Sequence, residues 1–255
     1  MLKIAKYTVY DIARNKIILS YAIFLLVISL SLFMLDNDPS RSLSSLMSVM
    51  LIVIPLVGII FSTIFIYNNS EFIELLVAQP VKRSYILLAD YLGVAGSLSL
   101  AYLIGMALPV TIYAPGTTGL YLIVTGIALT FIFTSIAFFC AVISRDKARG
   151  IGMALLLWFF FSVVYDGLLM GFLFLFNDYP LEKPVLFFTM FNPIDLARIT
   201  VMMKMDIAAL MGYTGAVYRD FFGTSIGMVF TLILLAIWAV IPLIIAVQIF
   251  RKKDL

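Results

Sequence analysis

Histidine is absent from this sequence of 255 residues, and cysteine occurs once. Without imidazole, the chain cannot form a bis-histidine haem site, a histidine-dependent protease site or most zinc and copper centres. The single cysteine, Cys140, lies in the apolar run FIFTSIAFFCAVIS and has no second cysteine for a disulfide or a metal site. We interpret it as a small buried apolar side chain.

Charged residues are also scarce, at 12% of the chain, whereas hydrophobic residues make up 64%. This composition lies far outside the range of soluble domains and indicates an integral membrane protein. Phosphate-binding motifs are lacking too: there is no GxxxxGK[ST] loop, no GxGxxG and no polar block large enough for a nucleotide-binding domain. We therefore expect this chain to hold no cofactor and to be no enzyme, with any ATP and Mg²⁺ bound by a partner subunit.

Long apolar runs account for most of the sequence. They cover residues 17–35, 45–67, 86–113, 120–143, 151–176 and 225–249. Each is near or above the roughly 20 residues that a helix needs to cross the bilayer core. Residues 2–16 carry apolar side chains on one helical face, which predicts a helix lying at the membrane interface. No repeat or polar linker divides the chain, so we predict an all-α, six-span membrane protein with residues 1–255 as one domain.

The distribution of lysine and arginine predicts the orientation of the chain. The short connections 36–41 and 114–119 contain a single basic residue, Arg41. Basic residues are frequent in the N-terminal arm, in the connections after the second and fourth spans and in the C-terminal tail. Because basic loops stay on the cytoplasmic side, both termini are expected in the cytoplasm. The expected location is the inner membrane of a bacterium.

A polar segment, EFIELLVAQPVKRSYILLADY, separates the second and third spans on the predicted cytoplasmic side. It begins with a short helix-like run, Pro80 interrupts it, and two basic residues follow in the break. A solvated charged loop is one interpretation. We favour a coupling helix, because apolar residues on a short helix outside the membrane need a partner surface. The residues assigned to this contact are Glu71, Glu74, Leu75, Leu76, Pro80, Lys82 and Arg83.

The connection 177–224, predicted to lie outside, is long enough to have a function of its own. Within it, Asn192 and Pro193 are typical of a helix start, since asparagine caps the first turn and proline fits the first helical position. The helix that follows, PIDLARITVMMKMDIAALM, has too many charges for a seventh span. We expect it to lie at the outer surface or to dock a partner.

Asp195 and Arg198 are three residues apart on this helix and can form an ion pair. Such a pair at the surface contributes only a few tenths of a kcal/mol. Alternatively, Asn192, Pro193, Asp195 and Arg198 form a docking platform for a periplasmic partner.

Asp166 lies inside the fifth expected span. A bare carboxylate in the bilayer is costly by several kcal/mol, so it must be protonated, paired or directed at a water-filled path. Two interpretations stay open: a hydrogen bond with a tyrosine or serine of a neighbouring span, for which Tyr102 and Tyr113 are candidates, or a role in a transport pathway.

Met202 and Met205 lie on one face of the expected outer helix. Thioethers can bind Cu(I), but methionines on such helices more often contact a membrane or a partner. No cysteine or histidine strengthens the site, so these residues are only weak candidates for a metal contact.

The order of these features resembles that of ABC-2 type permeases, the exporter-like membrane subunits of ABC transporters. The stretch LLVAQPVKRSYILLADYLG carries the resemblance together with the two acids before it, since the family has an acid, leucines, a proline and a basic residue between the second and third spans. The resemblance implies that this segment binds a separate ATPase subunit.

Three further stretches are similar to the NosY type of ABC-2 permease, which serves copper-site assembly in nitrous oxide reductase. They are LLLWFFFSVVYDGLLMGFLFLF around Asp166, FNPIDLAR in the outer connection and the C-terminal AVQIFRKKDL. The resemblance implies NosF-like ATPase subunits and a NosD-like periplasmic protein that binds the outer connection. Because six spans cannot easily enclose a path, we expect the working unit to be a homodimer.

Two other functions stay open. One is an ABC-2 exporter of a glycan, a peptide or a small toxic compound. The other is an ion-coupled secondary transporter that uses Asp166 as a proton site, which would need no ATPase.

Overall fold

The computed structural model describes residues 15–36, 38–77, 82–144, 146–176, 182–205 and 224–252. Within these ranges all regular structure is helical, and six helical runs are long and apolar enough to cross a membrane. The spans are α2 (Lys16–Leu35), α3 (Pro39–Asn68), α5 with η1 and α6 (Arg83–Tyr113), α7 (Thr117–Ile143), α8 with η2 and α9 (Lys147–Leu175), and α13 (Ser225–Lys252). The all-α class and the six expected spans are confirmed. The interfacial helix expected at 2–16 falls almost entirely outside the described residues.

Two of the spans contain a π-helical turn. In the third span, η1 (Leu103–Ala107) joins α5 (Arg83–Tyr102) to α6 (Leu108–Tyr113). In the fifth span, η2 (Phe160–Val164) joins α8 (Lys147–Phe159) to α9 (Tyr165–Leu175). A π-helical turn shifts the hydrogen-bond register by one residue and frees a backbone carbonyl.

Side-chain caps explain where several spans begin. The Asp38 carboxylate accepts a hydrogen bond from the backbone N–H of Ser40 at 2.9 Å, and Pro39 occupies the first turn of α3. Asp146 caps α8 in the same way, accepting from the backbone N–H of Arg149 at 3.1 Å. This backbone hydrogen bond lowers the pKa of the Asp146 carboxyl group.

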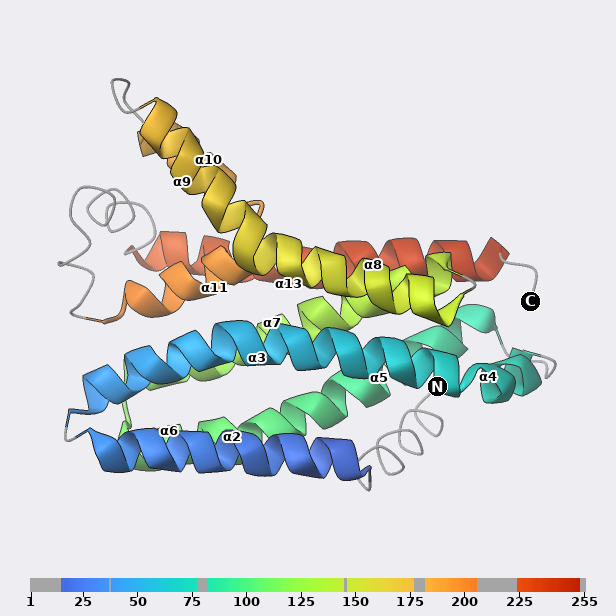
Figure 1. Ribbon diagram of the computed structural model, residues 1–255, viewed down its shortest axis with the longest axis horizontal. Helices are drawn as coiled ribbons and strands as arrows, with labels where there is room; N and C mark the ends of the chain where they lie inside the picture. The colour runs from blue at the N-terminus through green and yellow to red at the C-terminus, as the bar shows by residue number, and fades with distance from the viewer. Residues whose placement is uncertain are drawn as a thin grey trace.

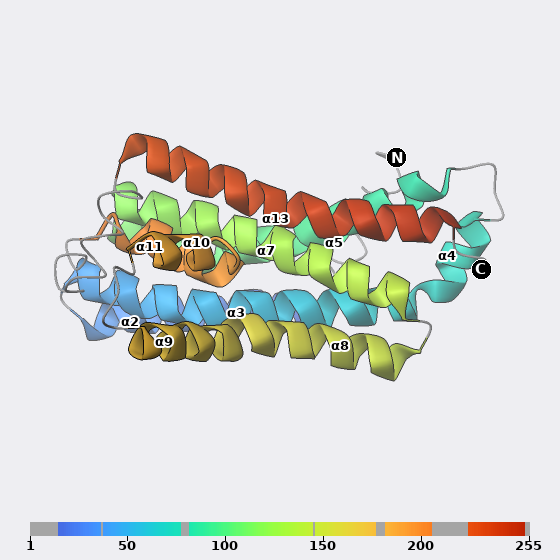
Figure 2. The same ribbon diagram turned by 90° about the horizontal axis from the view of Figure 1, so that it is seen from above.

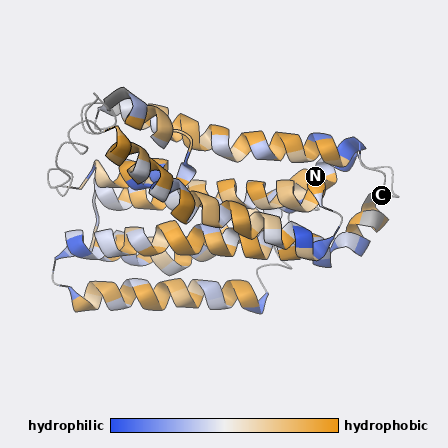
Figure 3. Cartoon of the chain, turned by 45° about the horizontal axis from the view of Figure 1, so that its top comes forward, coloured by the Kyte–Doolittle hydropathy of each residue, from blue (hydrophilic) through white to orange (hydrophobic). Residues whose placement is uncertain are grey.

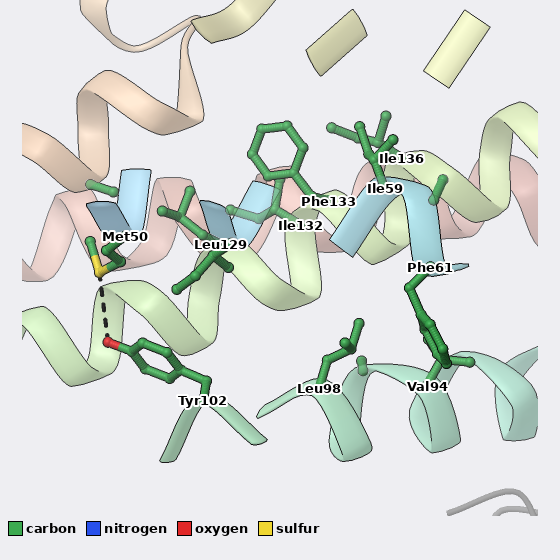
Figure 4. Packing of buried hydrophobic residues seen from close by; sticks show 14 of the residues in the cluster. Met50, Ile59, Phe61, Val94, Leu98, Tyr102, Leu129, Ile132, Phe133 and Ile136 are labelled. Atoms are coloured by element: carbon green, nitrogen blue, oxygen red, sulfur yellow. Dashed lines mark hydrogen bonds between the residues drawn. The ribbon is translucent and has the colours of Figure 1, made fainter. Parts of the chain in front are cut away.

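The spans form a bundle with α7 at its centre. Helices α3, α5 and α13 pack around α7 (Figures 1 and 2). Figure 4 shows Met50 of α3, Leu98 and Tyr102 of α5 and Leu129 of α7 converging in this core. Tyr102 donates a hydrogen bond to the Leu122 carbonyl at 2.9 Å, which satisfies its buried hydroxyl.

The peripheral helices keep exposed apolar faces, and the polar residues gather at the two ends of the bundle (Figure 3). One end carries α4 (Ser70–Val77) and the C-terminal end of α13; we call it the α4 end. The other end carries α11 (Pro193–Met202) and the α2–α3 and α6–α7 connections; we call it the α11 end. Such a division of apolar flanks and polar ends is what a bilayer requires.

Candidate functional site

Helix α4 follows α3 after a single turn residue, Asn69. The N–H of Asn69 donates to the Phe65 carbonyl at 3.0 Å, and the N–H of Ile73 donates to the Asn69 carbonyl at 2.9 Å. The Ser70 hydroxyl adds a bond to the Tyr67 carbonyl at 3.0 Å. Hydrogen bonding therefore continues from α3 into α4, so a force applied to α4 reaches the second span directly.

Helix α4 is anchored by one face and exposed on the other. Ile73 is buried, whereas Glu71 is exposed and Phe72 and Leu75 are 52% and 67% exposed. Leu76 is half-buried and packs against the core. Large apolar side chains left open at the end of a membrane bundle mark a surface for a partner.

The rest of the expected coupling segment is described in part. The backbone of Glu74 belongs to α4, but its side chain and Pro80 lie outside the described residues. Lys82 precedes α5 and is exposed, whereas Arg83 is the first residue of α5. The expectation that both basic residues lie in the break is therefore wrong for Arg83, because the helix resumes before it.

A second set of contacts at the α4 end was not predicted. The Tyr67 hydroxyl lies 3.2 Å from the Ser144 carbonyl, to which it donates, and Lys147 Nζ donates to the Asn68 side chain at 2.9 Å. Gly150 faces the Tyr67 ring, where a Cβ atom would collide with the hydroxyl. The last turn of α3 is thus bound to the α7–α8 connection. Tyrosine at a span end is a common signal, but its partner is far away in the sequence.

At the α11 end, four residues form a polar cluster that we call the Arg198 network: Asp166, Asn192, Asp195 and Arg198. One Arg198 nitrogen, Nη1, lies 3.0 Å from Asp166 Oδ2 and 3.0 Å from Asp195 Oδ1. The Asn192 amide donates to Asp195 Oδ2 at 2.9 Å. The network therefore joins α9 of the fifth span to α11.

Local hydrogen bonds explain the position of Asn192. Its side-chain oxygen accepts from the N–H of Ile194 at 3.0 Å, so it caps α11 as predicted. Its amide nitrogen also donates to the Phe161 carbonyl at 2.9 Å. The Phe161 carbonyl lies in η2. In a regular α-helix it would accept from the N–H of Tyr165, but here that N–H donates to the Phe160 carbonyl instead. The helix cap of α11 thus satisfies the carbonyl that the π-helical turn releases.

Helix α11 was expected to lie at the outer surface or to dock a partner. It lies at one end of the bundle, but it packs into the bundle and is not a surface helix. Leu196, Ala197 and Val201 are fully buried, and the helix packs against α7, α13 and α3. Asn192, Pro193 and Asp195 are buried as well. The hydrogen bonds that the side chains of Asn192 and Asp195 form make this burial tolerable. Docking of a partner at these four residues stays a prediction, and only Arg198 is partly exposed.

One of the two open interpretations of Asp166 was a hydrogen bond on a neighbouring span, with Tyr102 or Tyr113 as possible partners, and the structure shows a different partner. Its partner is Arg198, whereas Tyr102 donates to Leu122 and Tyr113 stacks on Phe33. The pair between Asp195 and Arg198 is present as predicted, but Asp166 shares the same cation.

The charges of the Arg198 network are unequal, with two carboxyl groups and one guanidinium. Burial is the main cause that raises the pKa of Asp195, to about 7. The Arg198 charge opposes this shift, and the neighbouring Asp166 carboxylate adds to it. The network can therefore accept a proton near neutral pH.

The methionine pair does not keep its expected geometry. Helix α11 ends at Met202, and Met205 lies in the following turn, where its sulfur is 3.9 Å from the Ser44 hydroxyl. Met202 packs against the apolar core and Met205 is buried. The two thioethers are therefore not on one exposed helical face, because the helix stops between them.

Comparison with known proteins gives a consistent result. The family model described as ABC-2 family transporter protein matches residues 2–255. The chain is similar to the "Probable ABC transporter permease protein NosY" of Pseudomonas aeruginosa, with 26% identity over 226 residues that cover 84% of this chain and 81% of that protein. It is also similar to the protein of the same name from Stutzerimonas stutzeri, with 25% identity over 275 residues that cover 98% of this chain and 97% of that protein.

Proposed function

We propose that α4 couples this chain to an ATPase carried on a separate polypeptide. The premise is that the chain belongs to the ABC-2 family of transporter proteins and is the permease subunit of an ABC transporter. The observation that supports the proposal is the exposure of Phe72 and Leu75 next to Glu71 on a short helix at the end of the bundle. Residues Glu74, Leu76, Pro80, Lys82 and Arg83 complete the proposed contact.

The proposed mechanism uses the direct connection between α4 and α3. ATP binding draws two ATPase subunits together and moves α4, and α3 follows because hydrogen bonding continues through Asn69. Tyr67 and Lys147 pass the movement on to the α7–α8 connection. The permease works as a homodimer, since one chain of six spans cannot easily enclose a path. The α4 end and both termini lie in the cytoplasm.

Charge reversal tests the coupling. We expect Glu71→Lys with Glu74→Lys to abolish copurification of the ATPase, while the permease still inserts into the membrane. The matched control is Arg251→Gln with Lys252→Gln, which also changes two charged residues at the α4 end and leaves association intact. ATPase retained by the charge-reversed permease contradicts the coupling role.

The finer function that we propose is support of copper-site assembly in nitrous oxide reductase. The resemblance to the NosY type and the names of the two relatives support it. The partners are then a NosF-like ATPase and a NosD-like periplasmic protein, which binds at the α11 end, with Arg198 as the accessible member of the predicted platform.

Complementation tests this finer function. A bacterium that lacks its own NosY permease is given this chain, and the copper content of its purified nitrous oxide reductase is measured. We expect copper to be restored together with copurification of the ATPase. An enzyme that stays copper-free while the ATPase complex forms supports an exporter of another compound, such as a glycan, a peptide or a small toxic molecule. Activity without any ATPase supports an ion-coupled transporter.

A further inference from the structure

The hairpin formed by α9 and α10 (Glu182–Thr189) leans away from the bundle at the α11 end (Figure 1). No residue of α9 is buried, and Met170 and Phe174 are 72% and 85% exposed. The two helices hold each other, because the Tyr165 hydroxyl donates to the Phe188 carbonyl and the Phe172 and Phe188 rings lie 5.0 Å apart. Val185 of α10 packs with Ile199 of α11 in a small apolar cluster that is separate from the main core. The hairpin is therefore supported by α11 and not by the core of the bundle.

Helix α11, in contrast, is fixed to the bundle at both ends. The Thr118 hydroxyl of α7 donates to the Lys204 carbonyl at 2.8 Å, just after the end of α11. The Trp238 indole of α13 donates to the Met190 carbonyl at 3.2 Å, just before its start. With its apolar face buried as well, α11 provides a rigid support beside the hairpin.

Helix α10 is joined to this support through residues 190–192 and the contact between Val185 and Ile199, whereas α9 and η2 are joined to it by two polar side-chain bonds. Arg198 binds Asp166, two residues beyond the end of η2, at 3.0 Å, and Asn192 binds the Phe161 carbonyl within η2 at 2.9 Å. π-Helical turns are points where a helix changes direction. The indole N–H of Trp158 and the hydroxyl of Ser162 are buried beside η2 and have no hydrogen-bond partner among the residues that the structure describes.

We propose that the Arg198 network is a latch that sets the angle of the α9–α10 hairpin, with η2 as its hinge. When the Asp166–Arg198 pair opens, the hairpin turns about η2 while α11 stays on the bundle. Asp195 lies on the same helix as Arg198, so it holds the guanidinium in place without connecting the two elements. The latch is independent of the compound that the transporter moves.

Distance measurement between spin labels tests the latch. Labels are attached after Phe174→Cys on α9 and Leu120→Cys on α7, both at exposed positions, in a Cys140→Ala background. The full chain is placed in lipid nanodiscs with excess unlabelled chain, so that only distances within one chain are measured. Position 174 lies about 15 Å along the helix from η2, so a turn of about 20° moves the label by about 5 Å.

The expected result is a narrow distance distribution in the parent chain and a shifted or clearly broader one after Asp166→Leu or Arg198→Met. The charge-swapped chain with Asp166→Arg and Arg198→Asp restores the narrow distribution, because the pair between α9 and α11 forms again. Asp195→Asn, the matched control on α11, leaves it unchanged. The latch is overturned by an unchanged distribution in both single variants, by a charge swap that stays broad, or by Asp195→Asn acting as strongly as Asp166→Leu.

Discussion

The two π-helical turns lie in spans with very different surroundings. Most residues of the third span, which contains η1, are buried inside the bundle, whereas only Gly150 and Ala154 are buried in the fifth span, which contains η2. In η1 the Gly105 carbonyl accepts from the Ser29 hydroxyl at 2.7 Å, and in η2 the Phe161 carbonyl accepts from the Asn192 amide at 2.9 Å. Both turns thus use a side chain from another element to satisfy a carbonyl.

The causes of the two turns differ. Pro109 lies four residues after Gly105 and has no N–H to offer its carbonyl, so the third span cannot continue as an α-helix there. No proline or glycine occurs in η2. There the bond from Asn192 replaces the helical bond, which makes this turn depend on the position of α11. A turn imposed by proline in a packed core is permanent, whereas a turn held by one polar contact can change.

Glycine substitutions should separate the two turns most strongly. A Cβ atom at Gly105 would lie 2.7 Å from both the Ala22 carbonyl oxygen and Leu25 Cβ, and the backbone of α2 cannot easily move. We expect Gly105→Ala to destabilise the protein by about 3 kcal/mol. Gly167→Ala, beside Asp166 in the fifth span, meets no atom within 4 Å and should be neutral or stabilising by up to about 1 kcal/mol. Thermal unfolding in detergent measures both, and equal losses would contradict the difference in packing.

Removal of the cation should have the next largest effect. Arg198→Met leaves Asp166 and Asp195 close together without a positive charge, at an expected cost of about 2 kcal/mol because the network is only partly exposed. Asp166→Asn, which leaves one carboxylate for one guanidinium, should cost clearly less. Chemical denaturation in detergent compares the two variants, and a larger loss for Asp166→Asn would show that the charge balance is not the main cause.

Loss of the hydroxyl at η1 should have a smaller effect. Ser29→Ala leaves the buried Gly105 carbonyl without its partner and should destabilise by about 1 to 2 kcal/mol. Ser31→Ala, an exposed position of the same helix, is the control and should change little. In a Pro109→Ala background the N–H at position 109 can reach the Gly105 carbonyl, so the loss from Ser29→Ala should become smaller. A double-mutant cycle measured by thermal unfolding gives this coupling.

The smallest expected effect is a pH dependence at α11. Since the pKa of Asp195 is raised from 3.8 to about 7, its protonated form is favoured in the folded protein. Stability should therefore be highest at low pH and decline as the pH rises to about 7. We expect a higher melting temperature at pH 5.5 than at pH 8, and a smaller difference after Asp195→Asn.

Asp146→Asn is the control for this pH dependence. The pKa of Asp146 is lowered from 3.8, so its titration lies below the tested range and the difference should persist. A pH difference that survives Asp195→Asn unchanged must come from another group.

Local patterns in the sequence predicted what depends on neighbours along the chain. The six spans follow from run length, the cap at Asn192 from the residues after it, and the pair of Asp195 with Arg198 from their spacing. The bond between Asp166 and Arg198 joins residues 32 positions apart. This bond forms only because α11 packs back against the fifth span. It was not predicted, because the polar residues of α11 suggested a position at the surface.

The same separation affects how the chain enters the membrane. Arg198 lies on α11, which is not one of the membrane spans, so the fifth span carries the Asp166 carboxyl group into the membrane without a cation on the same helix. At the centre of an inserting helix a charged residue such as aspartate costs about 3 kcal/mol, whereas each leucine or phenylalanine contributes about −0.5 kcal/mol. The long run of leucine and phenylalanine around Asp166 offsets that cost during biosynthesis. The apolar excess of this span therefore serves a step that is over before the folded protein exists.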